Sequence, residues 1–212
     1  MMEPELFNET ILNRFFETAF NLMNDYTTDK RGDIGSMVRE ASMYGISNTL
    51  KLLAKSPVNL SKLSGMSVQK SLTLILQQLA EKIDRTRLIA GSILQDLVDN
   101  AFNNLPDFSN KNIIKEIFQR ENIKKRFQGE QERLQTDYSL AEEMKSKLFS
   151  TISTQDSTNL KSMESSEGFI YYWNLPHCVF PLIVPLLELK EYSFFIVNEH
   201  SNLNDSSLKD SL

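Results

Sequence analysis

The stretch TTDKRGDIGSMVREASM, residues 27–43, begins with a polar turn and continues into an apolar periodic run. Asp33 stands at the expected start of a helix, where its carboxylate can accept hydrogen bonds from backbone N–H groups that lack partners in the first turn. Gly32 suits the turn that precedes the helix. Helical spacing then continues as far as Ser56 and Pro57, which favour a helix end. The stretch therefore predicts a turn followed by a helix over residues 33–55.

Helical spacing recurs on both sides of this stretch. Residues 5–25, 66–82 and 81–102 carry apolar side chains at intervals of three and four, which is typical of a helix with one buried face. Glycine and proline are scarce, at 7 and 6 of 212 residues, and this scarcity favours long regular elements over many turns. Strand-like alternation is hard to find, so we predict an all-α fold.

Two of the predicted helices share an ordered pair of charged residues. Asp84 and Arg87 repeat the order of Asp33 and Arg39, and the two arginines are 48 positions apart. A repeat of about 40–47 residues with two helices per unit is typical of HEAT proteins, in which each unit stacks on its neighbours. We therefore predict a HEAT/armadillo-like α-solenoid built from antiparallel helix pairs.

The two arginines allow two interpretations. In the first, Arg39 is partly buried beside Asp84 of the neighbouring pair, and the loss of either partner costs about 3–5 kcal/mol of folding free energy. In the second, Arg39 and Arg87 are exposed, and each contributes less than about 1 kcal/mol. The matched order of the charged residues favours the buried ladder, which is a structural feature and not a catalytic one.

The pattern changes after the helix pairs, which are expected to occupy residues 1–103. Residues 104–167 hold a run dense in charges of both signs and then a Ser- and Thr-rich stretch. They predict a solvated helical arm with a thin apolar seam, followed by a loop. Residues 168–197 are apolar again and predict C-terminal packing helices, whereas residues 198–212 predict a polar tail.

The apolar segment near the C-terminus holds a group of aromatic residues and several prolines. The aromatic side chains either form an interaction patch or close the end of the solenoid, and we favour packing. Pro185 should kink or restart the helix in which it lies, because proline has no backbone N–H and its ring clashes with the preceding turn. The aromatic group consists of Phe169, Tyr171, Tyr172 and Trp173.

Composition argues against several classes of protein. The net charge of −5 gives no reason to propose a nucleic acid as partner. Cys178 is the only cysteine, so an intramolecular disulfide is impossible, and the acidic N-terminus lacks the basic and apolar regions of a signal peptide. The most apolar run, residues 178–187, is too short for a membrane span, which needs about 20 residues. We therefore expect a cytoplasmic protein with no membrane span.

No pattern of catalytic residues or metal ligands stands out. There is no GxxxxGK[ST] stretch, so nucleotide hydrolysis has no phosphate cradle. His177 and Cys178 are adjacent and would point about 100° apart on a helix, which makes them a poor metal-binding pair. The other histidine is His200. We expect a non-enzymatic protein with no catalytic site, no cofactor and no metal.

Arg31, Gly32 and Asp33 also form a tripeptide known from cell adhesion. Adhesion requires secretion and an exposed loop, and the sequence shows no export signal. A structural interpretation gives each residue a role: Gly32 makes the turn, Asp33 caps the helix, and either Arg31 or Lys30 pairs with a neighbouring repeat. We favour the structural interpretation.

Three blocks of the sequence resemble the C-terminal domain of tubulin-folding cofactor D, also called tubulin-specific chaperone D. The blocks are residues 26–43, 81–94 and 173–197, and the first is the most specific. Met37 departs from the family pattern, which usually has tryptophan there, and the family's full proteins are several times longer, so a fragment or truncated form is expected. The matching motif residues are Arg31, Gly32, Asp33, Gly35, Val38, Arg39, Ala41, Met43, Lys82, Asp84 and Arg85.

The resemblance implies a scaffold in tubulin folding. Such a scaffold binds β-tubulin after its release from the chaperonin and assembles the α/β heterodimer with cofactors C and E. The complex activates GTP hydrolysis by tubulin, an Arf-like small GTPase associates with it, and its setting is the cytoplasm and the microtubule cytoskeleton. The basic run from Lys111 to Arg126 either contacts the acidic surface of tubulin or keeps the segment soluble. The alternatives are a generic HEAT-repeat scaffold for another complex and a remnant that binds nothing.

Overall fold

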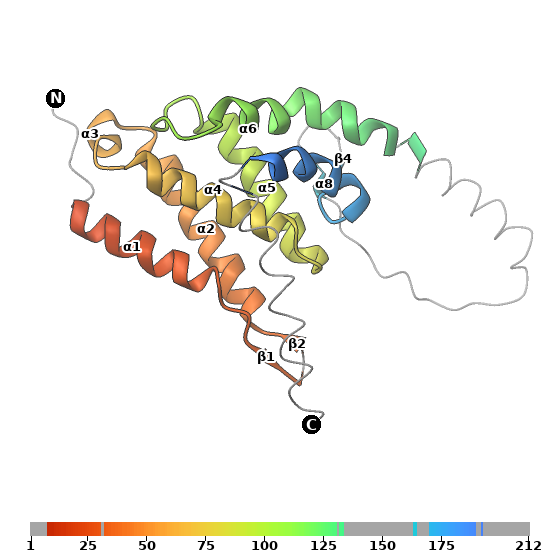
Figure 1. The fold of residues 1–212 in the computed structure, drawn as a ribbon, viewed down its shortest axis with the longest axis horizontal. Helices are drawn as coiled ribbons and strands as arrows, with labels where there is room; N and C mark the ends of the chain where they lie inside the picture. The colour runs from red at the N-terminus through yellow and green to blue at the C-terminus, as the bar shows by residue number, and fades with distance from the viewer. Residues whose placement is uncertain are drawn as a thin grey trace, which may run out of the picture.

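The computed structural model describes residues 8–30, 32–130, 132–133, 163–164, 170–189 and 192. Within these residues the chain is a stack of helices, as Figure 1 shows. The helices are α1 Glu9–Leu22, α2 Gly35–Leu53, α3 Pro57–Leu60, α4 Gly65–Leu79, α5 Asp84–Asn100, α6 Lys111–Phe118, α8 Pro176–Ile183 and the 3-10 helix η1 Val184–Glu188. Residues 120–130 are also helical and are called the 120–130 helix below.

Four of the first five helices form two antiparallel pairs that stack side by side, and the short α3 lies between the pairs in the chain. Helices α1 and α2 pack against each other, and so do α4 and α5. The pairs meet where α2 lies against α5 and where α1 contacts α4, so equivalent helices of the two units are neighbours (Figure 1). This arrangement is the one expected of stacked repeats. The predicted all-α, solenoid-like fold is confirmed.

The helix bounds follow the sequence pattern closely. The predicted helix over residues 33–55 is α2, and the runs at 5–25, 66–82 and 81–102 are α1, α4 and α5. Three of the helix starts have side-chain caps. Asn8 accepts a hydrogen bond from the backbone N–H of Thr10, and Ser56 and Ser64 act in the same way at the starts of α3 and α4.

The turn between α1 and α2 is more regular than predicted. Strands β1 Thr28–Asp29 and β2 Gly32–Asp33 form a two-residue antiparallel ladder there. Gly32 has a backbone φ of +115°, which residues other than glycine rarely adopt. Asp33 lies two residues before α2 and still accepts a hydrogen bond from the backbone N–H of Ser36 at 2.9 Å. The predicted roles of Gly32 and Asp33 are thus confirmed, although the residue directly before the helix is Ile34.

The hydrophobic core runs through both helix pairs, with α4 at its centre. Most of α4 from Ser71 to Leu79 is buried, because the helix contacts α5, α2 and α1. Its apolar side chains are thereby removed from water on nearly all sides, which is the main source of folding free energy. The buried apolar side chains of α4 are Val68, Leu72, Leu74, Ile75, Leu76 and Leu79.

The charged segment after the helix pairs is not a solvated arm in its described part. Helix α6 contacts α5, and four apolar side chains of α6 and the 120–130 helix have no solvent exposure. The sequence suggested a thin seam because charged residues separate these positions. This narrow apolar stripe is nevertheless enough to bury the two helices against the rest of the fold, because it packs on aromatic residues from far along the chain. The four buried side chains are Ile114, Phe118, Ile123 and Phe127.

The C-terminal segment packs against these helices. Trp173 is buried, and its ring lies 5.0 Å from that of Phe127 and 6.4 Å from that of Phe118, measured between centroids. Tyr172 is also buried, which confirms packing for this pair of aromatics, whereas Phe169 lies outside the described residues. Helix α8 ends at Ile183 and η1 begins at Val184, so the chain restarts at Pro185 as predicted.

The predicted loop and tail fall mostly outside the described residues. Within the predicted loop, Met163–Glu164 forms strand β3, which pairs antiparallel with strand β4 at Ile170–Tyr171. A two-residue ladder leaves no periodicity in the sequence, so composition alone missed it. Residues 134–162 and the tail at 198–212 are not described. Among the described helices, none combines the length and the apolar character that a bilayer crossing requires.

Candidate functional site

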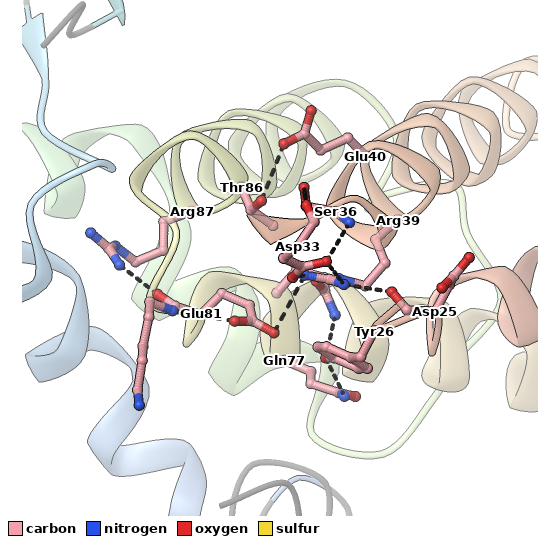
Figure 2. Close-up of polar contacts among 12 residues, drawn as sticks. Asp25, Tyr26, Asp33, Ser36, Arg39, Glu40, Gln77, Glu81, Thr86 and Arg87 are labelled. Atoms are coloured by element: carbon pink, nitrogen blue, oxygen red, sulfur yellow. Dashed lines mark hydrogen bonds and ion pairs between the residues drawn. The ribbon is translucent and has the colours of Figure 1, made fainter. Parts of the chain in front are cut away.

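The polar turn between α1 and α2 surrounds a fully buried guanidinium group. Arg39 of α2 has no solvent exposure, and Figure 2 shows it enclosed by polar groups from three elements. Its Nη2 donates to Asp33 Oδ2 at 2.8 Å, and its Nη1 donates to the backbone carbonyl oxygen of Asp25 at 2.5 Å. Its Nε donates to Gln78 Oε1 at 2.8 Å, and Glu81 lies 3.8 Å away. One side chain therefore ties α2, the turn before it and the end of α4 together.

Tyr26 covers the guanidinium group of Arg39. The Cζ atom of Arg39 lies 4.1 Å from the centre of the Tyr26 ring, which is cation–π geometry. The Tyr26 hydroxyl accepts from the side-chain amides of Gln77 and Gln78, both at 3.3 Å. Burial by itself lowers the pKa of Arg39, but the hydrogen bond that Arg39 donates to Asp33 and the electrostatic interactions with Tyr26, Asp33 and Glu81 outweigh burial and raise that pKa. Arg39 is therefore a permanent buried cation.

A second buried arginine occupies the matching place in the second helix pair. Arg87 of α5 is 1% exposed, pairs with Asp84 and donates to the backbone carbonyl oxygen of Glu81 at 2.5 Å. Each arginine thus pairs with an aspartate near the start of its own helix. Each also donates a hydrogen bond to a backbone carbonyl group just after the first helix of its pair. Arg87 also donates to the backbone carbonyl oxygen of Asn174 at 2.6 Å. This contact fastens the C-terminal segment to the stack.

The predicted ion pair between Arg39 and Asp84 is wrong. Asp84 pairs with Arg87, and no contact among the described residues joins it to Arg39. The alternative of two exposed arginines is wrong as well, because both are buried. The prediction failed because each arginine pairs with the aspartate that precedes it in its own repeat. Arg39 pairs with Asp33, and Arg87 pairs with Asp84.

Contacts between the two pairs exist, but other acids make them. Glu81 approaches Arg39 from the second pair, and Glu40 of α2 reaches across to α5. Glu40 is buried, accepts from the Thr86 hydroxyl at 3.1 Å and pairs with Arg85 at 2.9 Å (Figure 2 labels Glu40 and Thr86). Glu81 belongs to the motif at residues 81–85 that carries the family resemblance, whereas Glu40 was not singled out in the sequence.

The other residues of the sequence motif have different surroundings. Gly35 packs so closely on Asp25 that a Cβ atom there would clash with the backbone carbonyl group. Val38 is half-buried, Lys82 is exposed, and Arg31 lies outside the described residues. The motif therefore builds the turn and its buried arginine, and it does not assemble a set of converging reactive groups.

Two surface grooves are large enough to receive part of a partner. The first, of about 450 Å³, lies between α1 and α2 and is lined mainly by apolar side chains, including the 65% exposed Met37. The second, of about 740 Å³, lies between α6, the 120–130 helix and α8. Its lining joins Ile113, Ile117 and Leu182 to the exposed cations Lys125 and Arg126. Glu116 also lines this groove, so it combines apolar side chains with two cations and one carboxylate.

Much of the remaining positive charge near this groove is already paired. Lys111 donates to the carbonyl oxygen of Leu105, Lys115 bonds Asn103, and Arg120 pairs with Asp99 at 2.9 Å. These contacts fix α6 and the 120–130 helix on the end of α5. The basic run from 111 to 126 therefore has a structural half, which faces the stack, and an exposed half at the groove.

The chain matches the family model described as Tubulin folding cofactor D C terminal over residues 69–199. The matched range begins within α4 and includes α5 and all later described elements. Two blocks of the resemblance, at 81–94 and 173–197, lie inside this range, whereas the block at 26–43 precedes it. No solved structure matches the chain.

Proposed function

Because the chain belongs to the tubulin folding cofactor D family, we propose that it is a non-enzymatic scaffold that binds β-tubulin and assists assembly of the α/β heterodimer. The observation that carries the proposal is the match to the family's C-terminal model over more than half of the chain. A stack of helix pairs supports it physically, since such a stack offers an extended surface for a partner protein. Binding acts by stabilising one conformation of the partner, without covalent chemistry.

We place the tubulin contact at the second groove, between α6, the 120–130 helix and α8. Its apolar side chains can bury side chains of a partner, and its two exposed cations, Lys125 and Arg126, outnumber the one carboxylate, Glu116, and so suit an acidic surface such as that of tubulin. Cations at the rim of an interface mainly speed association and reject wrong partners. The proposed contact should therefore weaken as salt concentration rises.

The remaining partners follow from the same family membership. We propose that the chain works with cofactors C and E, and that it contributes to GTPase activation of tubulin only within their complex. An Arf-like small GTPase is a further proposed partner. The proposed setting is the cytoplasm and the microtubule cytoskeleton.

The test is capture of purified β-tubulin by the immobilised chain, with and without cofactors C and E. A charge-matched helical protein serves as the background control. We expect saturable capture above that background. Capture no greater than background would remove tubulin binding from the function of this chain.

A pair of charge-reversed variants tests the location of the contact. The double variant Lys125→Glu with Arg126→Glu should lose about tenfold in affinity, equal to about 1.4 kcal/mol. The control is Arg14→Glu with Lys55→Glu, which makes the same charge change at exposed positions of the first helix pair. Equal losses in the two double variants would show a non-specific charge effect and would move the contact away from the groove.

A further inference from the structure

Three potential metal ligands meet where the 120–130 helix approaches the start of α8. Glu130, His177 and Cys178 each offer one ligand atom, and these atoms all lie within 4.8 Å of one another. The Nε2 atom of His177 is 3.0 Å from Oε1 of Glu130. Cys178 is buried and has a free thiol, whereas His177 is exposed at the surface. The cluster therefore has a protein-facing side and a path from solvent.

We propose that Glu130, His177 and Cys178 bind a zinc ion. Imidazole, thiolate and carboxylate are the three donor types that zinc takes in proteins, with bonds of about 2.0–2.3 Å. In a tetrahedral site such bonds place the ligand atoms roughly 3.3–3.6 Å apart. The His177 and Glu130 atoms are already within a few tenths of an ångström of that separation, and side-chain rotation brings the sulfur of Cys178 closer.

The donor set also selects the class of metal. Magnesium and calcium prefer oxygen ligands only, so a sulfur and an imidazole nitrogen exclude them. Three protein ligands leave a fourth position for water or another ligand, in contrast to closed structural zinc sites with four. We infer a site that holds zinc at the surface.

Arg133 adjusts this site from outside. Its Nη2 donates to Oε1 of Glu130 at 2.5 Å, and its Nε donates to Oε2 at 3.1 Å. Zinc takes the place of one donor at Oε1, and the bond from Nε to Oε2 remains. Arg133 then orients the ligating carboxylate, as hydrogen-bond partners of metal ligands commonly do.

The proposed ligands come from two segments that lie far apart in the sequence. His177 and Cys178 alone make a poor pair, and Glu130 supplies the missing third donor from the 120–130 helix. The same two segments already pack through Phe127 and Trp173. A bound ion would therefore add a second fastening between the C-terminal segment and the stack. This inference is independent of tubulin binding.

Cobalt is the probe, because Co²⁺ enters zinc sites and gives a thiolate-to-metal charge-transfer band. Cys178 is the only cysteine, so such a band in the full chain can come from no other residue. We expect the band to grow to one equivalent of Co²⁺ and to vanish when Zn²⁺ is added. A folded chain that shows no band at one equivalent of Co²⁺ would overturn the proposal.

Variants separate a three-ligand site from binding by the thiol alone. His177→Gln and Glu130→Gln should each weaken cobalt binding at least tenfold, and His200→Gln, at the other histidine, should leave it unchanged. If the first two variants bind cobalt as the parent chain does, only the thiol is bound, and the proposal is wrong. Circular dichroism of each variant establishes that it is folded, and His177→Gln changes a side chain that is exposed and so leaves the core intact.

Discussion

The buried guanidinium group of Arg39 gives the sharpest prediction. Replacing Arg39 with methionine keeps an unbranched side chain of similar length and removes every hydrogen-bond donor. The change removes one hydrogen-bond donor from each of Asp33, Gln78 and the carbonyl group of Asp25, and Asp33 keeps its bond from the backbone N–H of Ser36. Asp33 is only partly exposed, so water replaces the lost partner incompletely.

The expected loss is a large fraction of the stability of the fold. Hydrogen bonds to a charged group contribute about 1.5–3 kcal/mol each, but methionine regains part of the loss through apolar burial. Breaking one side of a buried ion pair costs about 3–5 kcal/mol in total. For a chain of this size, that loss lowers the melting temperature by roughly 6–20 °C. Small proteins have only about 5–15 kcal/mol of stability, so the variant should be visibly weakened.

Urea unfolding of the full chain, followed by circular dichroism, measures this loss. The matched control is Arg14→Met, which replaces an exposed arginine of α1 and should change the free energy of unfolding by less than about 0.5 kcal/mol. Arg39→Lys keeps the charge but cannot donate in three fixed directions, so it should lie between the two.

A double-mutant cycle with Asp33→Ala isolates the ion pair. Residues in direct contact typically couple by about 0.5–3 kcal/mol, so the double variant should lose less than the sum of the single losses. If Arg39→Met costs less than about 1 kcal/mol, the guanidinium group is solvated in solution. The hydrogen bonds of Arg39 would then contribute no more to the folding free energy than those of an exposed arginine.

Two further predictions concern the C-terminal segment. Gly91→Ala places a Cβ atom against the indole of Trp173, so it should cost about 1–3 kcal/mol and shift the fluorescence of this single tryptophan to the red. The control Gly129→Ala has open space and should be neutral or stabilising, and equal costs at the two glycines would refute the close contact. Burial raises the pKa of the Cys178 thiol to about 11 from 9.0, and Glu130 adds to the effect. At pH 8 the reactive thiolate should therefore be about 100-fold rarer in the folded chain than in urea, and stability should fall as pH rises from 9 to 11, because the unfolded chain loses that proton first. Equal alkylation rates in the folded and unfolded chains would contradict the burial of this thiol.

The helices could be predicted from sequence because each has its own periodic apolar face. The roles of Gly32 and Asp33 could also be predicted, since a positive φ favours glycine and a helix start favours a side chain that accepts a hydrogen bond. Such features depend only on neighbouring residues. For this reason the bounds of α2 and its turn differ from the prediction by only two residues at each end.

The partners of the charged groups could not be predicted in the same way. Arg39 was expected to meet Asp84, but each arginine pairs with the acid that precedes it in its own turn, which leaves no aspartate for the neighbouring helix pair. The burial of Phe118 and Phe127 was missed because their partner, Trp173, lies far along the chain. Glu130 was likewise not predicted as a metal ligand, because its partners His177 and Cys178 also lie far along the chain.

Sedimentation velocity of the purified chain mixed with purified β-tubulin tests the proposed function most directly. We predict a discrete complex that saturates at equal molar amounts and weakens as salt rises, because Lys125 and Arg126 line the proposed contact. Independent sedimentation of the two proteins across the whole concentration range would contradict a tubulin-binding scaffold.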